Sequence, residues 1–134
     1  SKHEIEQKLL RVGYRPCTVE MVLYKLEREH LLNDADFARQ WVEARSGRKL
    51  GRSRIAQELR RKGIDADEAE EALSAIDEDD QLADAIALAE KAAARAKSDE
   101  DPRKTYQRIA AMLARRGFRW DITKEALAQV LQAD

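Results

Sequence analysis

Residues 58–76 read ELRRKGIDADEAEEALSAI, and this stretch decides the fold. A basic turn ends at Gly63, an apolar residue follows at once, and a run of helix-forming residues begins shortly after it. Glycine adopts the left-handed backbone conformation without a Cβ penalty, and Lys or Arg before it suits the negative end of a helix. The apolar residue after the glycine can fold back onto the preceding turn. The stretch therefore predicts a tight corner between two helices.

The same pattern occurs twice more along the chain. Residues 8–26 read KLLRVGYRPCTVEMVLYKL and residues 112–130 read MLARRGFRWDITKEALAQV, so both align with residues 58–76 on a glycine. Three copies of one pattern predict an array of helical repeats. The aligned residues are Leu9, Leu59 and Leu113; Gly13, Gly63 and Gly117; Tyr14, Ile64 and Phe118; Leu23, Leu73 and Leu127; Leu26, Ile76 and Val130.

A further helix is expected ahead of the second corner and another ahead of the third. Asn33 or Asp34 can cap the first of these, which should end near Gly47. The second should run from about residue 79 to residue 97, and Pro102 suits the first turn of the helix after it. The inward positions expected on these two helices are Phe37, Ala38, Trp41 and Val42, then Leu82, Ala83, Ile86 and Ala89.

The predicted fold is therefore all-α, with tandem three-helix units of the helix-turn-helix kind in an elongated or curved array. The expected units span residues 1–32, 33–77 and 78–134. In the first unit, Ser1 and Glu4 match a capping box, and no helix precedes it. We therefore expect that unit to lack its first helix.

Charge is divided into blocks along the chain, although the net charge is only −1. Residues 45–62 hold eight basic side chains against one acid, and residues 102–120 hold six against none. The segment between them holds fourteen acids against three bases. Such segregation indicates a surface with distinct charged faces, although charge runs can also be plain solvated helix faces.

The residue types that enzymes need are scarce. Cys17 is the single cysteine, there are two histidines, and no glycine-rich phosphate loop or nucleophile elbow occurs. We therefore expect no enzyme, no metal and no cofactor. No apolar stretch is long enough to cross a membrane, and we expect a reduced, cytoplasmic protein.

The basic blocks are the candidate interface with a partner. Arg48, Lys49 and Arg52 surround a predicted helix start, where backbone N–H groups and positive side chains favour a phosphate or a carboxylate. Trp120 beside Arg119 could stack on a base or simply pack. The candidate partner- or DNA-binding residues are Arg45, Arg48, Lys49, Arg52, Arg54, Arg60, Arg61, Lys62, Arg103, Lys104, Arg108, Arg115 and Arg116.

Residues 31–64, LLNDADFARQWVEARSGRKLGRSRIAQELRRKGI, resemble the central signature of the RecX family, and the repeats on either side match as well. Leu50 and Arg52 depart from it, because the family often has an aromatic residue and a proline there. Arg15 and Arg119 stand where many members have a small polar helix cap, whereas Asp65 conforms. The matching residues are Leu32, Asn33, Asp34, Phe37, Ala38, Arg45, Gly51, Arg54, Ile55, Glu58, Leu59, Lys62, Gly63 and Ile64.

The resemblance implies a negative regulator of the RecA recombinase, active in DNA repair, recombination and the SOS response. Such a protein binds in the groove of the RecA–DNA filament and blocks filament extension, ATP hydrolysis, strand exchange and coprotease activity. It also implies some contact with single- or double-stranded DNA through phosphates, with no membrane and no small-molecule substrate. The alternative is a helix-turn-helix DNA-binding module without RecA-specific action, but no expected helix has the Asn, Gln and Arg pattern of base readout.

Overall fold

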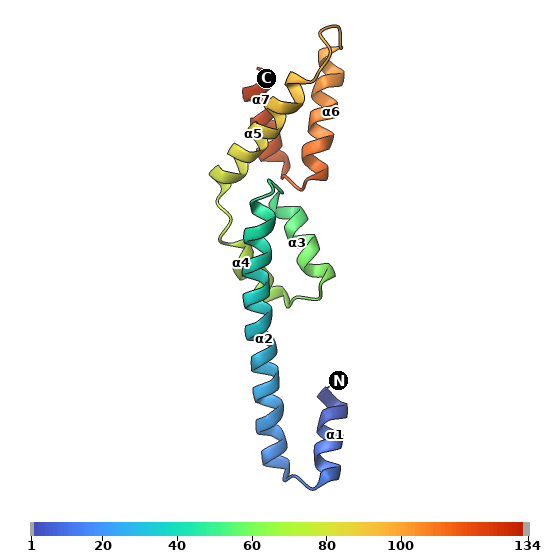
Figure 1. Ribbon diagram of the computed structural model, residues 1–134, viewed down its shortest axis with the longest axis vertical. Coiled ribbons are helices and arrows are strands. Elements are labelled where there is room, and N and C mark those ends of the chain that lie inside the picture. The colour runs from blue at the N-terminus through green and yellow to red at the C-terminus, as the bar shows by residue number, and fades with distance from the viewer. Residues whose placement is uncertain (1, 133–134) are drawn as a thin grey trace.

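The computed structural model describes residues 2–132, and within them the chain is all-α, as the sequence predicts. The elements form an elongated array, with the N-terminal hairpin at one end and the last three helices at the other (Figure 1). No described helix is long and apolar enough to cross a membrane. The helices are α1 (Lys2–Val12), α2 (Pro16–Ser46), α3 (Arg52–Arg61), α4 (Ala66–Leu73), α5 (Glu78–Ala94), α6 (Pro102–Arg115) and α7 (Trp120–Leu131).

The three glycine corners are confirmed, and each is a Schellman motif. Gly13, Gly63 and Gly117 have φ of +105°, +74° and +95°. At the middle corner the N–H of Ile64 donates to the Leu59 carbonyl at 3.2 Å, which closes the last turn of α3. The same bond recurs at both other corners, at 3.2 and 3.1 Å. Each corner thus joins two helices, α1 to α2, α3 to α4 and α6 to α7.

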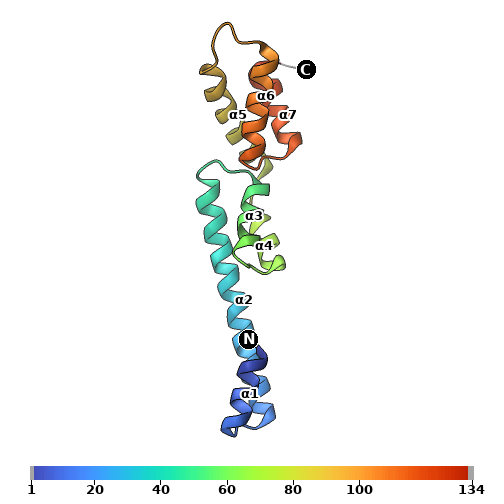
Figure 2. The ribbon, with the colours of Figure 1, turned by 90° about the vertical axis from the view of Figure 1, so that its right-hand side faces the viewer.

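The expected helix start at Asn33 or Asp34 is wrong. α2 is one continuous helix of 31 residues that passes through both positions. Residues 17–46 contain neither Gly nor Pro, so nothing interrupts the backbone hydrogen bonds there, and a possible cap does not end a helix. Asp34 acts on another helix instead, because its carboxylate accepts the N–H of Asp65 at 3.3 Å, beside the start of α4. A single rod therefore connects the N-terminal hairpin with the middle of the molecule (Figure 2).

Two separate cores lie along the array. α2, α3 and α4 enclose the first, and α5, α6 and α7 enclose the second. The aligned leucines Leu59 and Leu113 are fully buried in them. The N-terminal hairpin buries little, because α1 has no buried residue and only Val19 and Leu23 of α2 are buried there.

Two residues expected to face inward are exposed, and one expected feature lies outside the described residues. Phe37 is exposed, because the buried residues of this part of α2 are Ala38 and Val42. Ala83 is exposed, because the buried stripe of α5 runs through Gln81, Ala85 and Ala89. The capping box falls on Ser1, which is outside the described residues. α2 and α7 begin without a side-chain cap, as the arginines at these positions suggested, yet both helices form.

The two cores meet where two glycines bring their backbones together. The N–H of Gly51 donates to the Arg116 carbonyl at 2.7 Å. A Cβ on Gly51 would lie 2.2 Å from the carbonyl carbon of Gly117, and a Cβ on Gly117 would lie 2.3 Å from the Cβ of Arg54. No other residue type fits either position without displacing backbone. This contact fixes the start of α3 against the corner between α6 and α7.

Replacing each of these glycines with alanine should therefore lower the free energy of unfolding by a different amount. Gly63→Ala should lower the free energy of unfolding by about 1–3 kcal/mol, because it strains φ but meets no atom within 4 Å. Gly117→Ala should cost more than Gly63→Ala, since the added Cβ also collides with Arg54. Urea unfolding followed by circular dichroism measures both values.

Gly47→Ala is the matched control, because Gly47 has φ of −61° and its nearest atom to an added Cβ is 3.5 Å away. It should leave the free energy of unfolding unchanged or raise it slightly. Equal losses for Gly63→Ala and Gly117→Ala would contradict the close approach at the junction.

Candidate anion-binding cleft

The helix start that the sequence favoured as an anion site is closed. The N–H of Arg52 donates to the side-chain oxygen of Gln81 at 2.9 Å, and the N–H of Ser53 donates to the Gly117 carbonyl at 3.1 Å. The amide nitrogen of Gln81 donates to the Leu50 carbonyl at 3.2 Å. Groups from α5 and from the α6–α7 corner thus occupy the N–H groups that a phosphate would need. That expectation is wrong, because tertiary contacts satisfy this helix terminus.

Two of the candidate arginines are engaged inside the fold. Arg45 forms a two-pronged ion pair with Glu58, with N–O distances of 2.8 and 3.0 Å, and about a fifth of its side chain is exposed. Arg52 donates to the Leu73 carbonyl at 2.8 Å and to the Glu70 carboxylate at 3.0 Å. Arg45 therefore ties α2 to α3, and Arg52 caps the C-terminal end of α4. Both side chains are only partly exposed and already have partners within the fold.

The basic residues at the far end of α3 form a different group. The ammonium of Lys62 lies 4.4 Å from the centre of the Trp41 ring, and the Phe37 ring stacks on Trp41 with centroids 5.8 Å apart. Cation–π contact of this kind holds the lysine against α2. Arg60 and Arg61 are exposed beside it. This group lies at the opposite end of α3 from the junction with α5 and α6.

A basic cleft lies at the junction of the two cores. It is a cavity of about 480 Å³ between the start of α3, the second half of α5 and the end of α6. Its lining contains five cations and no carboxylate, with apolar side chains between them. Phosphates and carboxylates are the groups that such a cleft can hold, through charge-assisted hydrogen bonds. The lining residues are Arg54, Leu88, Lys91, Ala92, Arg95, Met112, Arg115 and Arg116.

Hydrogen bonds to main-chain carbonyls hold two of these arginines in place. Arg116 reaches across the junction to the carbonyls of Arg48 and Lys49, at 2.6 and 3.2 Å. Arg54 reaches back to the Arg115 carbonyl at 3.3 Å. These bonds join the two basic blocks, residues 45–62 and residues 102–120, at the junction. The side chains of Arg48 and Lys49 are exposed next to them.

The remaining candidates lie elsewhere on α6. Arg103, Lys104 and Arg108 are exposed on the first turns of that helix, away from the junction. Arg108 pairs with Glu100 at 3.1 Å, and hydrogen bonds from Arg108 and then Thr105 lower the pKa of the Glu100 carboxyl. Acids from the α5–α6 loop share this region, so its net charge is low. It is a weaker site for an anion than the cleft.

The cleft also contains two cations that the sequence analysis omitted. Lys91 and Arg95 are exposed at the C-terminal end of α5, inside the segment that counts as acidic overall. The spacing of Leu88, Lys91 and Arg95 could have indicated this group, because intervals of three and four residues put all three on one face of a helix. The net negative charge of the whole segment hid these two cations.

Comparison with known proteins settles the family. The family model for the second three-helix domain of RecX matches residues 33–73, and that for the third matches residues 78–127. The chain belongs to the RecX family. The regulatory protein RecX of Mycobacteroides abscessus is 38% identical over 96% of this chain, which spans 65% of that relative's length. That of Mycobacterium marinum is 34% identical over the whole chain, which spans 78% of its length.

Solved RecX structures have the same arrangement of helices. The crystal structure of RecX from Lactobacillus salivarius matches with a TM-score of 0.72 and 28% identity, over 99% of this chain and 86% of that one. A crystal structure described as regulatory protein RecX matches with a TM-score of 0.66 and 26% identity, over 94% and 62% of the two chains. The resemblance that the sequence suggested is thus confirmed.

The free energy of unfolding should distinguish arginines that are engaged within the fold from those that are exposed at the cleft. Arg45→Ala should lower the free energy of unfolding by about 2 kcal/mol, because it leaves the partly buried Glu58 without its hydrogen bonds. Arg95→Ala should change it by less than about 0.5 kcal/mol, as an exposed side chain at the cleft does. Urea unfolding at neutral pH measures both. Equal effects would contradict the assignment of Arg45 to the interior of the fold.

Proposed function

We propose that this chain is a negative regulator of RecA that binds the RecA–DNA filament and blocks filament extension, ATP hydrolysis, strand exchange and coprotease activity. Membership of the RecX family supports this, since the matched relatives are named regulatory proteins. The observation that contributes most is the basic cleft at the junction of α3, α5 and α6. It gives the molecule a binding surface with five cations, of which four are exposed and Arg116 is half-buried.

The cleft suits a filament because two of its cations are already held in place. Arg54 and Arg116 are held by main-chain carbonyls, and Lys91 and Arg95 extend from a helix packed in the second core. A surface that needs little ordering on binding loses less entropy when it meets its partner. The anionic groups it contacts are carboxylates of RecA or phosphates of the bound DNA.

The elongated shape supports the same proposal. A helix rises about 1.5 Å per residue, so the 31 residues of α2 span roughly 46 Å before the second core adds further length. An array of this length can contact more than one subunit of a filament. We extend the proposal to three repeat units, at residues 1–32, 33–77 and 78–134, and to action in the cytoplasm on DNA repair and the SOS response.

Charge reversal in the cleft tests this function. The double variant Lys91→Glu, Arg95→Glu should raise the concentration that half-inhibits the ATPase of RecA on single-stranded DNA by at least tenfold, because it replaces two attractive charges with repulsive ones. The measurement is a titration at near-physiological salt, starting well below one protein per RecA. Binding to the same DNA without RecA is measured in parallel.

The matched control is Lys25→Glu, Lys124→Glu, which makes the same change in net charge at exposed positions of α2 and α7. It should shift half-inhibition less than twofold. Inhibition that survives the cleft variant unchanged would remove the cleft from the interface. Inhibition only at concentrations that coat the DNA would favour the DNA-binding module instead.

A further inference from the structure

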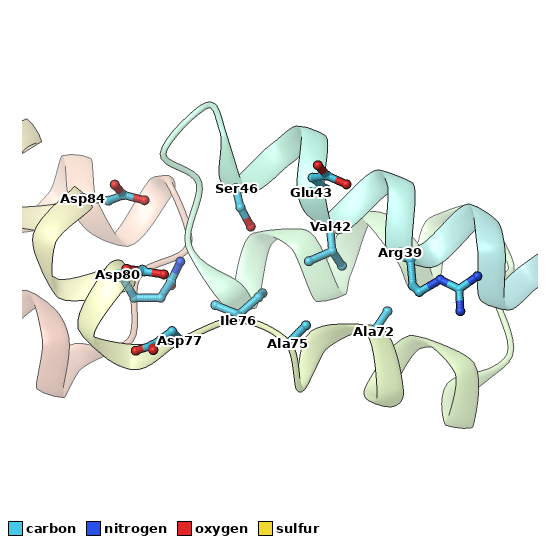
Figure 3. Close-up of a pocket in the computed structure, with 11 residues that line it drawn as sticks. Arg39, Val42, Glu43, Ser46, Ala72, Ala75, Ile76, Asp77, Asp80 and Asp84 are labelled. Carbon is cyan, nitrogen blue, oxygen red and sulfur yellow. The ribbon is translucent and has the colours of Figure 1, made fainter.

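A second concave surface lies beside the basic cleft and has the opposite charge. It is a groove of about 400 Å³ between α2, the end of α4 and the start of α5 (Figure 3). Its floor is apolar and is formed by Val42, Ala72, Ala75 and Ile76, whose side chains lie between α2 and α4 in the close-up. The groove is therefore shaped to bury an apolar part of a partner.

Carboxylates surround this floor. Glu43 comes from α2, Asp77 precedes α5, and Asp80 and Asp84 lie on α5. Glu43, Asp80 and Asp84 make no ion pair within residues 2–132. The one cation in the lining is Arg39, which pairs with Asp36 and lies at the opposite end of the groove from Asp80 and Asp84 (Figure 3). The rim is thus strongly negative on the side of α5.

The environment of Asp84 is unfavourable for a bare negative charge. Burial raises the pKa of its carboxyl, the neighbouring Asp80 raises it further, and Lys49 opposes the rise. A cation placed in the groove would relieve this cost, because it would pair with carboxylates that make no ion pair within residues 2–132.

The groove and the cleft lie on one face of α5. Asp80, Asp84, Leu88, Lys91 and Arg95 follow one another at intervals of three or four residues, so they form one stripe along the helix. The first two line the groove and the last three line the cleft. Asp84 and Arg95 are about 16 Å apart along the helix axis, given a rise of about 1.5 Å per residue.

From this juxtaposition we infer that the α5 face is a bipolar docking surface for a protein segment, which inserts a Lys or Arg flanked by apolar residues into the groove and presents an acidic group to the cleft. A nucleic acid fits this surface poorly, because phosphates attracted to the cleft would be repelled by the groove beside it. Opposite charges at the two ends also fix the direction in which the partner lies. The inference rests on the proposed function in taking RecA as that partner.

The test on the filament reverses the groove charge. The double variant Asp80→Lys, Asp84→Lys should weaken binding to RecA filaments on single-stranded DNA by at least tenfold, measured by co-sedimentation. The control Glu71→Lys, Glu90→Lys makes the same change in net charge at exposed positions outside the groove, and should change binding less than twofold. Equal binding by the two variants would overturn the inference, as would a loss of naked-DNA binding that accounts for the loss on filaments.

A second test does not need RecA. The probe is the peptide N-acetyl-Leu-Arg-Leu-amide, with its neutral citrulline analogue as the comparison, titrated into the ¹⁵N-labelled protein. The arginine peptide should shift amide resonances at Val42, Ala75, Ile76 and Asp84 at least fivefold more than the analogue. Asp84→Asn, a nearly isosteric change that should not disturb folding, should reduce the shifts by at least half.

The two tests separate the possible failures. If the peptide occupies the groove but the wild-type protein does not bind filaments, the proposed function fails and the docking of a basic segment stands. If the wild-type protein binds filaments but the peptide shifts no groove resonance, or shifts them as the citrulline analogue does, the inference is overturned and the proposed function stands.

Discussion

The close backbone contact between Gly51 and Gly117 is the constraint on which the rest of the structure depends. Two chain segments 66 residues apart approach so closely that neither can have a side chain, and a hydrogen bond of 2.7 Å from Gly51 joins them. Gly117 meets a second requirement as well, because its positive φ closes the end of α6. The two cores therefore meet in a defined orientation, and the basic cleft and the acidic groove are both products of that orientation.

The same junction determines which basic side chains are engaged within the fold. At this junction Gln81 accepts the N–H of Arg52 at the start of α3. The side chain of Arg52 donates to the Leu73 carbonyl at the end of α4, and that of Arg116 donates to the Arg48 carbonyl in the loop before α3. A guanidinium that satisfies carbonyl or carboxylate groups of its own chain is costly to withdraw for a partner. In the cleft, the cations without such a hydrogen bond within residues 2–132 are Lys91, Arg95 and Arg115. Counting charges in sequence blocks could not reveal this division.

α5 combines a structural role with the charged surface to which we assign recognition. One stripe of it packs in the second core, and the adjacent stripe changes from acidic near its N-terminus to basic near its C-terminus. This order of charges suits the helix dipole, because acids are favourable near the positive N-terminus and bases near the negative C-terminus. The junction then places a concave wall beside each end of the stripe, from α2 and α4 at the acidic end and from α3 and α6 at the basic end.

The sequence by itself determined the local structure and the family. The three glycine corners, the helical repeat and the RecX signature all depend on residues close together in the chain, and left-handed glycines and helical periodicity are local properties. The tertiary structure decided the rest. Asn33 and Asp34 failed as a helix start because nothing interrupts α2. Lys91 and Arg95 line the cleft because α3 and α6, which are distant in the chain, pack beside α5. Which charges are engaged and which line the cleft depends on contacts between residues far apart in the chain, and such contacts form only when the cores meet.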